Sequence, residues 1–391
     1  MNNTPKLRFK EFSGDWESKK LGDLLEFKNG INASKEQYGH GRKFINVLDI
    51  LNNNYITHEN IIGKVDVDEA TFEKYSVGYG DVVFQRSSET REEVGTANVY
   101  LDKKQNATFG GFIIRGKKVG EYDPIFMNKL LKTSSARKEI TTKSGGSTRY
   151  NVGQETLSDV EVKFPKLEEQ EKIASLFSLI DDKISLKGEK VEALKEYKKG
   201  MMQKIFSREL RFKDDEGRDY PEWEEKKLVD ITDIGTGSND LQDKVEDGIY
   251  PFFVRSANVE RINSYTFDGE AILIPGDGNI GQIYHYINGK FAYHQRVYKI
   301  SDFINGVSGK YIYYYMSRFF LKEALKNSVK ATVDSLRLPT LKEMDILLPC
   351  IDEQEKITQL LSNIDAKVKK EKEKLDSLNE YKKGLLQQMF I

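Results

Sequence analysis

Apolar residues recur in alternating steps of four and three along two stretches of the chain, residues 173–205 and 357–389. In each stretch eight of ten such positions are apolar, and most residues between them are charged. A heptad pattern held this long is typical of helices that pack as a left-handed coiled coil. The predicted seam consists of Ile173, Phe177, Ile180, Ile184, Val191, Leu194, Met201, Ile205, Ile357, Leu361, Ile364, Val368, Leu375, Leu378, Leu385 and Met389.

Each helix is predicted to begin after a proline, Pro165 or Pro349, because acidic residues follow at once and favour a helix N-terminus. A rod of about 38 residues, at ~1.5 Å per residue, is longer than a small domain. We therefore expect the two helices to cover each other's seams; packing of each helix on its neighbouring domain is the alternative. Lys187 and Glu371 interrupt the seam, either as hydrated positions or as partner contacts.

The two helical stretches are copies of one sequence. "EEQEKI" at 168–173 returns as "DEQEKI" at 352–357, and 165–207 lies over 349–391 without a gap. Roughly half of these positions are identical, which indicates an internal repeat rather than a chance match.

The segment at the start of each copy is repeated as well. "LRFK" occurs at 7–10 and 210–213, and Trp16 and Trp223 each stand three residues before Lys-Lys-Leu. The chain is thus predicted to hold two units, each with a variable middle and a shared helical tail. The predicted boundaries are 1–160 for the first variable domain, 161–207 for the central helix, 208–345 for the second variable domain and 346–391 for the C-terminal helix.

The variable middles combine strand and helix signals. Alternating or continuous apolar runs at 81–84 and 271–274 are typical of strands, and 123–140 and 309–326 are typical of helices. The predicted fold class is α+β, with two small mixed α/β domains and two long helices.

Composition limits the kinds of protein this can be. The chain has 391 residues, of which 38% are hydrophobic and 31% charged, with one cysteine, Cys350. Its length favours two domains, and no apolar run approaches the ~20 residues that span a bilayer. The N-terminal stretch lacks the apolar core of a signal peptide, so we expect a cytoplasmic protein.

The net charge of -1 argues against a general binder of polyanions, so DNA binding would require local basic patches. Two such patches follow the predicted helices. Residues 137–150 carry four basic residues against one acidic residue, and residues 318–337 carry five against two. "KSGGSTRYN" at 143–151 combines donors with flexible backbone, which suits phosphate contacts or entry into a groove. A solvated loop is the alternative for any single residue.

Further polar clusters follow the predicted strands. "FGGFIIR" at 109–115 aligns with "YHQRVYK" at 293–299, and arginine, asparagine and glutamine are the side chains that read guanine and adenine edges. The predicted DNA-contacting residues are Arg86, Ser87, Ser88, Thr90, Arg91, Lys143, Ser144, Ser147, Thr148, Arg149, Tyr150, Asn151, Arg255, Ser256, Asn258, Asp277, Asn279, Gln282, His294, Gln295, Arg296, Lys330 and Thr332.

The sequence carries no motif of a catalytic or cofactor site. It lacks a GxxxxGK[ST] phosphate loop, a glycine motif for dinucleotide or S-adenosylmethionine, and a nucleophile elbow. The four histidines and Cys350 do not have zinc-ligand spacing. We therefore expect no catalytic residue, metal or cofactor on this chain. An enzyme with a degenerate site, or a non-catalytic scaffold whose variable domains bind protein, are the alternatives.

The arrangement resembles the specificity subunit of type I restriction-modification systems. The resemblance rests on the Pro-x-x-[ED]-EQ-x-x-I junctions at Pro165 and Pro349, the "EYKKG" segments at 196–200 and 380–384, the "LRFK" openings, and "SGGSTRYN" at 144–151. The second middle departs from the pattern there, with "NSVKATVDSL" in place of the glycine pair.

The resemblance implies that each middle is a target recognition domain that reads one half of a split site in double-stranded DNA. It further implies that the helices form an antiparallel coiled coil with pseudo-twofold symmetry, which holds the readers apart and docks partners. Two methyltransferase (M) subunits would bring S-adenosylmethionine and adenine methylation. Restriction (R) subunits would bring ATP- and Mg²⁺-dependent translocation and cleavage.

Overall fold

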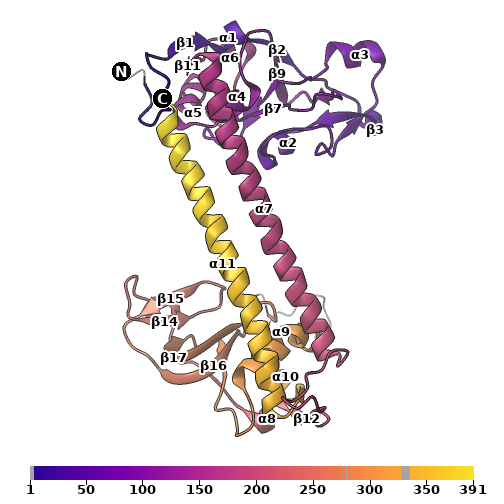
Figure 1. Ribbon diagram of the computed structural model, residues 1–391, viewed down its shortest axis with the longest axis vertical. Helices are drawn as coiled ribbons and strands as arrows, with labels where there is room; N and C mark the ends of the chain where they lie inside the picture. Colours follow the sequence, from indigo (N-terminus) through magenta and orange to yellow (C-terminus); the bar gives the residue numbers. More distant parts are fainter. Residues whose placement is uncertain (1–3, 279, 327–334) are drawn as a thin grey trace. The chain divides into compact units, whose positions relative to one another are not determined.

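Two long helices, α7 (Leu167–Phe206) and α11 (Ile351–Met389), occupy the heptad stretches (Figure 1, magenta and yellow). The computed structural model describes residues 4–278, 280–326 and 335–391. The chain divides into unit 1, Met1–Gly188 with Glu373–Ile391, and unit 2, Glu189–Lys372. Both boundaries fall inside the long helices, so each unit contains one sheet domain and a part of each helix.

In the domain of unit 1 the first and last strands pair with each other: β1 (Glu17–Lys20) runs antiparallel to β11 (Glu161–Phe164). Between them lie a four-stranded sheet, a three-stranded sheet and a short ladder. The four-stranded sheet has the order β2 (Leu25–Asn29), β9 (Ile113–Lys118), β5 (Val82–Gln85) and β7 (Ala97–Val99). The three-stranded sheet has the order β4 (Lys64–Val65), β3 (Tyr38–Ile45) and β8 (Thr108–Phe109). The short ladder pairs β10 (Tyr150–Asn151) with β6 (Ser87–Ser88).

Short helices connect these strands: α1 (Leu21–Leu24), η1 (Lys35–Gln37), α2 (Val47–Asn52), α3 (Glu69–Lys74), α4 (Pro124–Leu130), α5 (Ser134–Lys143) and α6 (Gln154–Ser158). The stretch 123–140, expected as one helix, forms both α4 and α5. The break has a local cause, because the hydroxyl of Thr133 accepts a hydrogen bond from the amide of Ala136 and so caps a new helix.

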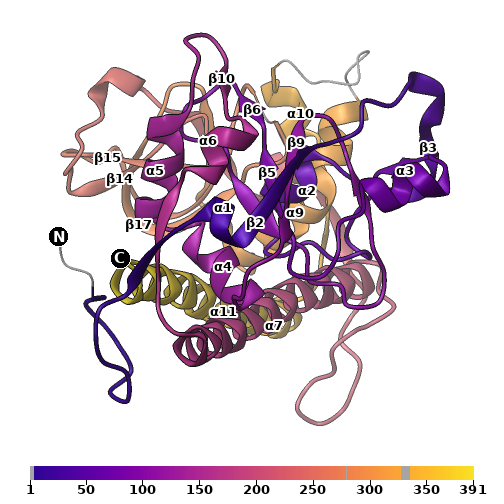
Figure 2. The same cartoon turned by 90° about the horizontal axis from the view of Figure 1, so that it is seen from above.

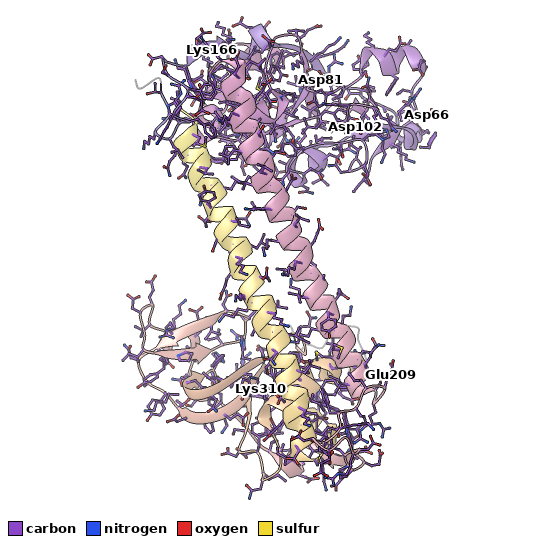
Figure 3. The ribbon with its side chains drawn as sticks, viewed as in Figure 1. Asp66, Asp81, Asp102, Lys166, Glu209 and Lys310 are labelled. Carbon is purple, nitrogen blue, oxygen red and sulfur yellow. The ribbon has the colours of Figure 1, made fainter. Side chains whose placement is uncertain are left out.

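The core of unit 1 joins its sheet to the long helices. Figure 2 shows α4 between this sheet and α7. The ring of Phe126 in α4 packs against Phe164 and Phe390, with ring centroids 5.6 and 5.3 Å away. Asp81, labelled in Figure 3, lies inside the domain and accepts a hydrogen bond from the amide of Lys118 at 2.9 Å, which ties β5 to β9. Burial raises the pKa of the Asp81 carboxyl.

Unit 2 is built on the same plan with a larger sheet. Its ends again pair, since β12 (Glu224–Lys227) runs antiparallel to β19 (Asp345–Leu348). The six-stranded sheet has the order β13 (Asp233–Thr236), β18 (Val297–Ser301), β16 (Phe267–Pro275), β17 (His285–Tyr293), β14 (Tyr250–Phe253) and β15 (Val259–Ile262). The connecting helices are α8 (Leu228–Ile231), η2 (Leu241–Asp243), α9 (Gly309–Lys326) and α10 (Leu338–Lys342).

The predicted seam residues are all buried or half-buried. In unit 1, Phe177 and Ile180 of α7 share one apolar cluster with Leu385 and Met389 of α11, and the cluster also contains the domain core. In unit 2, the C-terminal end of α7 shares a cluster with the N-terminal end of α11 and with the second domain. The helix segments therefore run antiparallel within each unit. Packing on the partner helix and packing on the domain therefore occur together.

Glu371, which interrupts the seam of α11, has an ion-pair partner on α7. The carboxylate of Glu371, whose residue is 8% exposed, lies 3.6 Å from the ammonium of Lys190 of α7 in unit 2.

The repeated hexapeptide fastens each long helix to its domain. In unit 1 the carboxylate of Glu169 accepts hydrogen bonds from Arg8 of the "LRFK" segment, at 2.8 Å from Nε and 2.7 Å from Nη2. The side chain of Gln170 accepts from the amide of Asp123 at 3.1 Å and donates to the carbonyl of Pro165 at 2.9 Å. Both Glu169 and Gln170 are almost fully buried.

Unit 2 repeats these contacts with its own residues. The carboxylate of Glu353 accepts from Arg211 Nη2 at 2.9 Å and from Trp223 Nε1 at 3.0 Å. The side chain of Gln354 accepts from the amide of Ser308 at 2.9 Å. The two copies of the hexapeptide therefore have a structural role, which explains why buried polar residues are repeated.

No helix among the residues described is both long and apolar enough to cross a membrane.

Candidate nucleic-acid interface

In unit 1, the ladder between β6 and β10 brings two predicted clusters together. Ser87 pairs with Asn151 and Ser88 with Tyr150. On the far side of β10, the backbones of Gly145 and Asn151 exchange hydrogen bonds of 3.0 and 2.8 Å. Residues 86–91 and 143–151, which are well separated along the chain, thus form one surface.

Part of this surface is open to solvent. Ser147, Thr148 and Arg149 are exposed on the loop before β10, and Arg86 and Asn151 are exposed beside it. An open pocket of about 740 Å³ lies here, lined by residues that include Arg86, Lys143 and Asn151. The surface therefore presents guanidinium, hydroxyl and amide groups within a small area.

Other predicted residues of this unit hold the surface in place. Ser88 is buried and donates to Glu93 at 2.9 Å, and Arg91 Nε donates to the carbonyl of Thr141 at 3.1 Å. Lys143 lines the pocket but donates to the carbonyl of Asp159 at 2.8 Å. The remaining predicted residues here also make local contacts: the amide of Thr90 donates to Ser88 Oγ, Ser144 Oγ donates to the carbonyl of Thr141, and Tyr150 packs against the core.

In unit 2, three loops meet around one carboxylate. Asp277 follows β16, and its Oδ2 accepts hydrogen bonds from Arg255 Nη1 at 3.3 Å and from Arg296 Nη1 at 3.0 Å. The side chains of both arginines stay largely exposed, at 45% and 63%. A single carboxylate therefore orients two guanidinium groups that face solvent.

His294 lies beside this cluster and bonds to the backbone of Arg296. It is buried, and its Nδ1 accepts a hydrogen bond from the amide of Arg296 at 2.9 Å. Burial, and then the nearby charge of Arg255, lower the pKa of His294 below its ordinary value. A buried, neutral imidazole shapes the turn that carries Arg296, rather than contacting a ligand directly.

The other predicted residues of unit 2 are less closely gathered. Gln295 Nε2 donates to Asp240 at 2.7 Å, and Ser256 and Asn258 hydrogen-bond each other across a tight turn. Gln282 is exposed. The predicted residues Asn279, Lys330 and Thr332 lie outside the described residues.

The two surfaces are built on the same hydrogen-bond frame. In unit 1 the amide of Arg86 donates to the carbonyl of Phe112 at 2.9 Å, and the amide of Val152 donates to the carbonyl of Arg86 at 3.0 Å. In unit 2 the amide of Gly276 donates to the carbonyl of Arg296 at 2.8 Å, and the amide of Leu336 donates to the carbonyl of Gly276 at 2.7 Å. Gly276 therefore takes the place of Arg86.

By the same register, Phe112 takes the place of Arg296. The sequence pattern predicted a DNA contact at Arg296 but none at Phe112, which is 67% exposed. The signal that could have found it was the alignment of 109–115 with 293–299, in which these two residues coincide.

Across the described parts of both units, no group of three or more histidine, cysteine, aspartate or glutamate residues is placed to hold a metal ion.

Both halves of the chain match the same known protein family. The family model of the type I restriction modification DNA specificity domain matches residues 13–196 and again residues 220–380. The MjaVIII type I restriction enzyme specificity subunit of Methanocaldococcus jannaschii is 23% identical over 97% of this chain and 94% of its own length. The EcoDI specificity subunit of Escherichia coli is 29% identical over 42% of this chain and 36% of that protein.

A solved structure has the same fold. The S subunit of a type I restriction-modification system from M. genitalium superimposes with a TM-score of 0.65 at 17% identity, covering 99% of each chain.

Proposed function

Because the chain belongs to the type I restriction modification DNA specificity family, we propose that each unit reads one half of a bipartite target in double-stranded DNA. One observation carries this proposal. The two units share a hydrogen-bond frame but present different side chains on it: Arg86, Ser87 and Phe112 in unit 1 against Gly276, Asp277 and Arg296 in unit 2. A common frame with different exposed groups suits two readers of different sequences.

The chemistry of each surface supports contact with DNA. Arg149, Ser147 and Thr148 of unit 1 lie on a glycine-bearing loop and can donate to phosphates. Arg255 and Arg296 of unit 2, oriented by Asp277, can each form paired hydrogen bonds with the O6 and N7 atoms of guanine. Contacts to the DNA phosphates would position the chain on the duplex, and contacts to the guanine edges would specify the DNA sequence.

Catalysis in this proposal belongs to partner subunits. Methyltransferase subunits docked on the chain would bind S-adenosylmethionine and methylate adenine in the target. Restriction subunits would use ATP and Mg²⁺ for translocation and cleavage. The chain itself supplies the sequence specificity.

The helices offer support for a partner that binds twice. In the repeated "EYKKG" segments, Lys198 and Lys382 form ion pairs inside their units. Tyr197 and Tyr381 are 54% and 57% exposed. An exposed tyrosine adds little to folding, so its repetition at equivalent positions supports two copies of one partner, the methyltransferase subunit, binding there.

The test is to map methylated adenines in DNA from cells that produce the chain with its partner subunits. We expect a motif of two specific parts separated by an unread gap. Exchanging residues 22–160 for those of a related protein should change one part and leave the other unaltered. A single continuous motif, or changes in both parts, would contradict two separate readers.

A gel-shift assay separates this function from that of a protein-binding scaffold. The assembled methyltransferase should prefer DNA that contains the mapped motif over DNA that lacks it. A complex without any preference among DNA sequences would support the scaffold, and activity of the chain without partners would support an enzyme.

A further inference from the structure

Phe112 is the most exposed aromatic residue in the described part of the chain, at 67%. It ends the tight Gly110-Gly111-Phe112 turn between β8 and β9. Large apolar side chains are normally withdrawn from water when the fold permits. At the candidate DNA surface, the exposed ring is accessible to a ligand.

The turn holds Phe112 in a fixed place. The amide of Ile113 donates to the carbonyl of Gly110 at 2.9 Å, and the carbonyl of Phe112 accepts from the amide of Arg86 at 2.9 Å. A Cβ atom on Gly111 would lie 1.9 Å from Asn32 Oδ1, so no other residue fits there without movement. The aromatic ring is thus carried by a backbone that is closely packed on both sides.

Two arginines, Arg86 and Arg149, belong to the backbone frame that carries this apolar side chain. Arg86 is bonded to the turn through its backbone amide, and its Nη1 lies 3.4 Å from the carbonyl of Gly111. The exposed loop with Arg149 is joined to the same frame through the amide of Val152, which donates to Arg86. Phosphate contacts by these arginines would bring the ring against the bases.

We propose that Phe112 is a specificity-determining residue of unit 1, whose ring packs against the 5-methyl group of a thymine in the major groove. This inference rests on the proposed function. The thymine methyl group is the apolar feature of the major groove, and phenylalanine is among the side chains that contact it. At the equivalent position of unit 2, Arg296 offers hydrogen bonds instead, so the same frame would select a different base.

The experiment uses the assembled methyltransferase complex and DNA that carries the mapped target. Each thymine of the half-site read by unit 1 is replaced in turn by deoxyuridine, which removes only the methyl group. For the native chain, one such replacement should weaken binding about fourfold, the loss expected for one buried methyl group. The Phe112→Ala complex should bind more weakly and should not respond to that replacement.

Val119→Ala is the matched control, because Val119 is an exposed apolar residue, at 59%, beyond the opposite end of β9. It should bind like the native chain and keep the response to deoxyuridine. Circular dichroism of both variants should match that of the native chain, since neither side chain is buried.

The possible results distinguish failure of the Phe112 contact from failure of the proposed DNA-reading function. If the native complex prefers its target but Phe112→Ala responds to every replacement as the native chain does, the thymine contact is wrong. Weaker binding by Phe112→Ala without any response of the native chain to deoxyuridine would mean insertion between bases, and would also overturn the proposal. A native complex without sequence preference would overturn the proposed function itself.

Discussion

Glu353 is fully buried, and its carboxylate is neutralised by Arg211 and bonded to Trp223. Arg211→Met would leave this carboxylate buried without a counter-charge. Removing one partner of a buried ion pair costs about 3–5 kcal/mol, so we expect a loss of this size in the free energy of unfolding of unit 2. The measurement is urea denaturation followed by tryptophan fluorescence.

The chain has two tryptophans, so Trp16→Phe leaves Trp223 as the reporter for unit 2. Adding Glu353→Gln to Arg211→Met removes the uncompensated charge and should recover part of the loss. A loss well below 1 kcal/mol for Arg211→Met would show that the contact is not an important part of this junction.

His294 should make the stability of unit 2 depend on pH. Burial lowers its pKa below the ordinary value of 6.5, so the unfolded chain takes up the proton first as the pH falls. The stability associated with the neutral ring is therefore complete above pH 6.5 and is lost as the pH falls from there through the folded pKa.

The check is urea denaturation at pH 7 and 5.5 for the native chain and for His294→Gln, whose side-chain oxygen can still accept a hydrogen bond from Arg296. The native chain should lose more stability on acidification than the variant. His285, whose pKa burial also lowers, should leave some dependence in both. Equal losses in the two proteins would assign the effect to other groups.

At the scale of the helices, the repeat produces two corresponding ion pairs. Lys382 of α11 lies 2.6 Å from Asp181 of α7 in unit 1, and Lys198 of α7 lies 2.6 Å from Asp365 of α11 in unit 2. Asp181 also accepts from Lys129 at 2.6 Å and its side chain is 7% exposed. Asp365 is 40% exposed. The same contact is therefore buried in one unit and hydrated in the other.

We expect Asp181→Asn to lower the free energy of unfolding by about 3–5 kcal/mol, because it leaves the buried ammonium groups of Lys129 and Lys382 without a counter-charge. Asp365→Asn should cost about 1 kcal/mol or less, as for other solvated ion pairs. Each variant is the control for the other, since both change the same position of the repeat. Equal losses, measured by urea denaturation with a tryptophan reporter in each unit, would contradict this difference in burial.

At the scale of the whole molecule, α7 and α11 each contribute to both units, so their length should affect the gap in the target. Four residues added to each helix, near Gly188 and Lys372, lengthen it by roughly 6 Å at ~1.5 Å per residue. Since base pairs rise about 3.4 Å, we expect a gap about two base pairs wider.

Four residues make just over one helical turn, while two base pairs rotate the DNA by roughly 70°, so the junctions at Pro165 and Pro349 must absorb the difference. The measurement is the methylated motif of the lengthened protein. Unaltered half-sites with a wider gap would support this role of the helices. An active variant that keeps the original gap would refute it.

Several features could be predicted from the sequence because their signals are local or repeated. The seam from Ile173 to Met389 follows from heptad spacing, which depends on neighbouring residues alone. The two-unit plan follows from comparing the chain with itself. The strands near 81–84 and 271–274 follow from short apolar runs, and the structure contains β5 and β16 there.

The candidate DNA surfaces depend on contacts that local sequence patterns do not encode. The pairing of Ser87 with Asn151, the two arginines on Asp277 and the exposure of Phe112 all arise where separate loops meet. Sequence spacing does not fix which side chains share a loop surface, and it treats an exposed phenylalanine as a core residue. The sequence determined the helices, the repeat and the family, whereas the tertiary structure decided which polar residues support the fold and which face solvent.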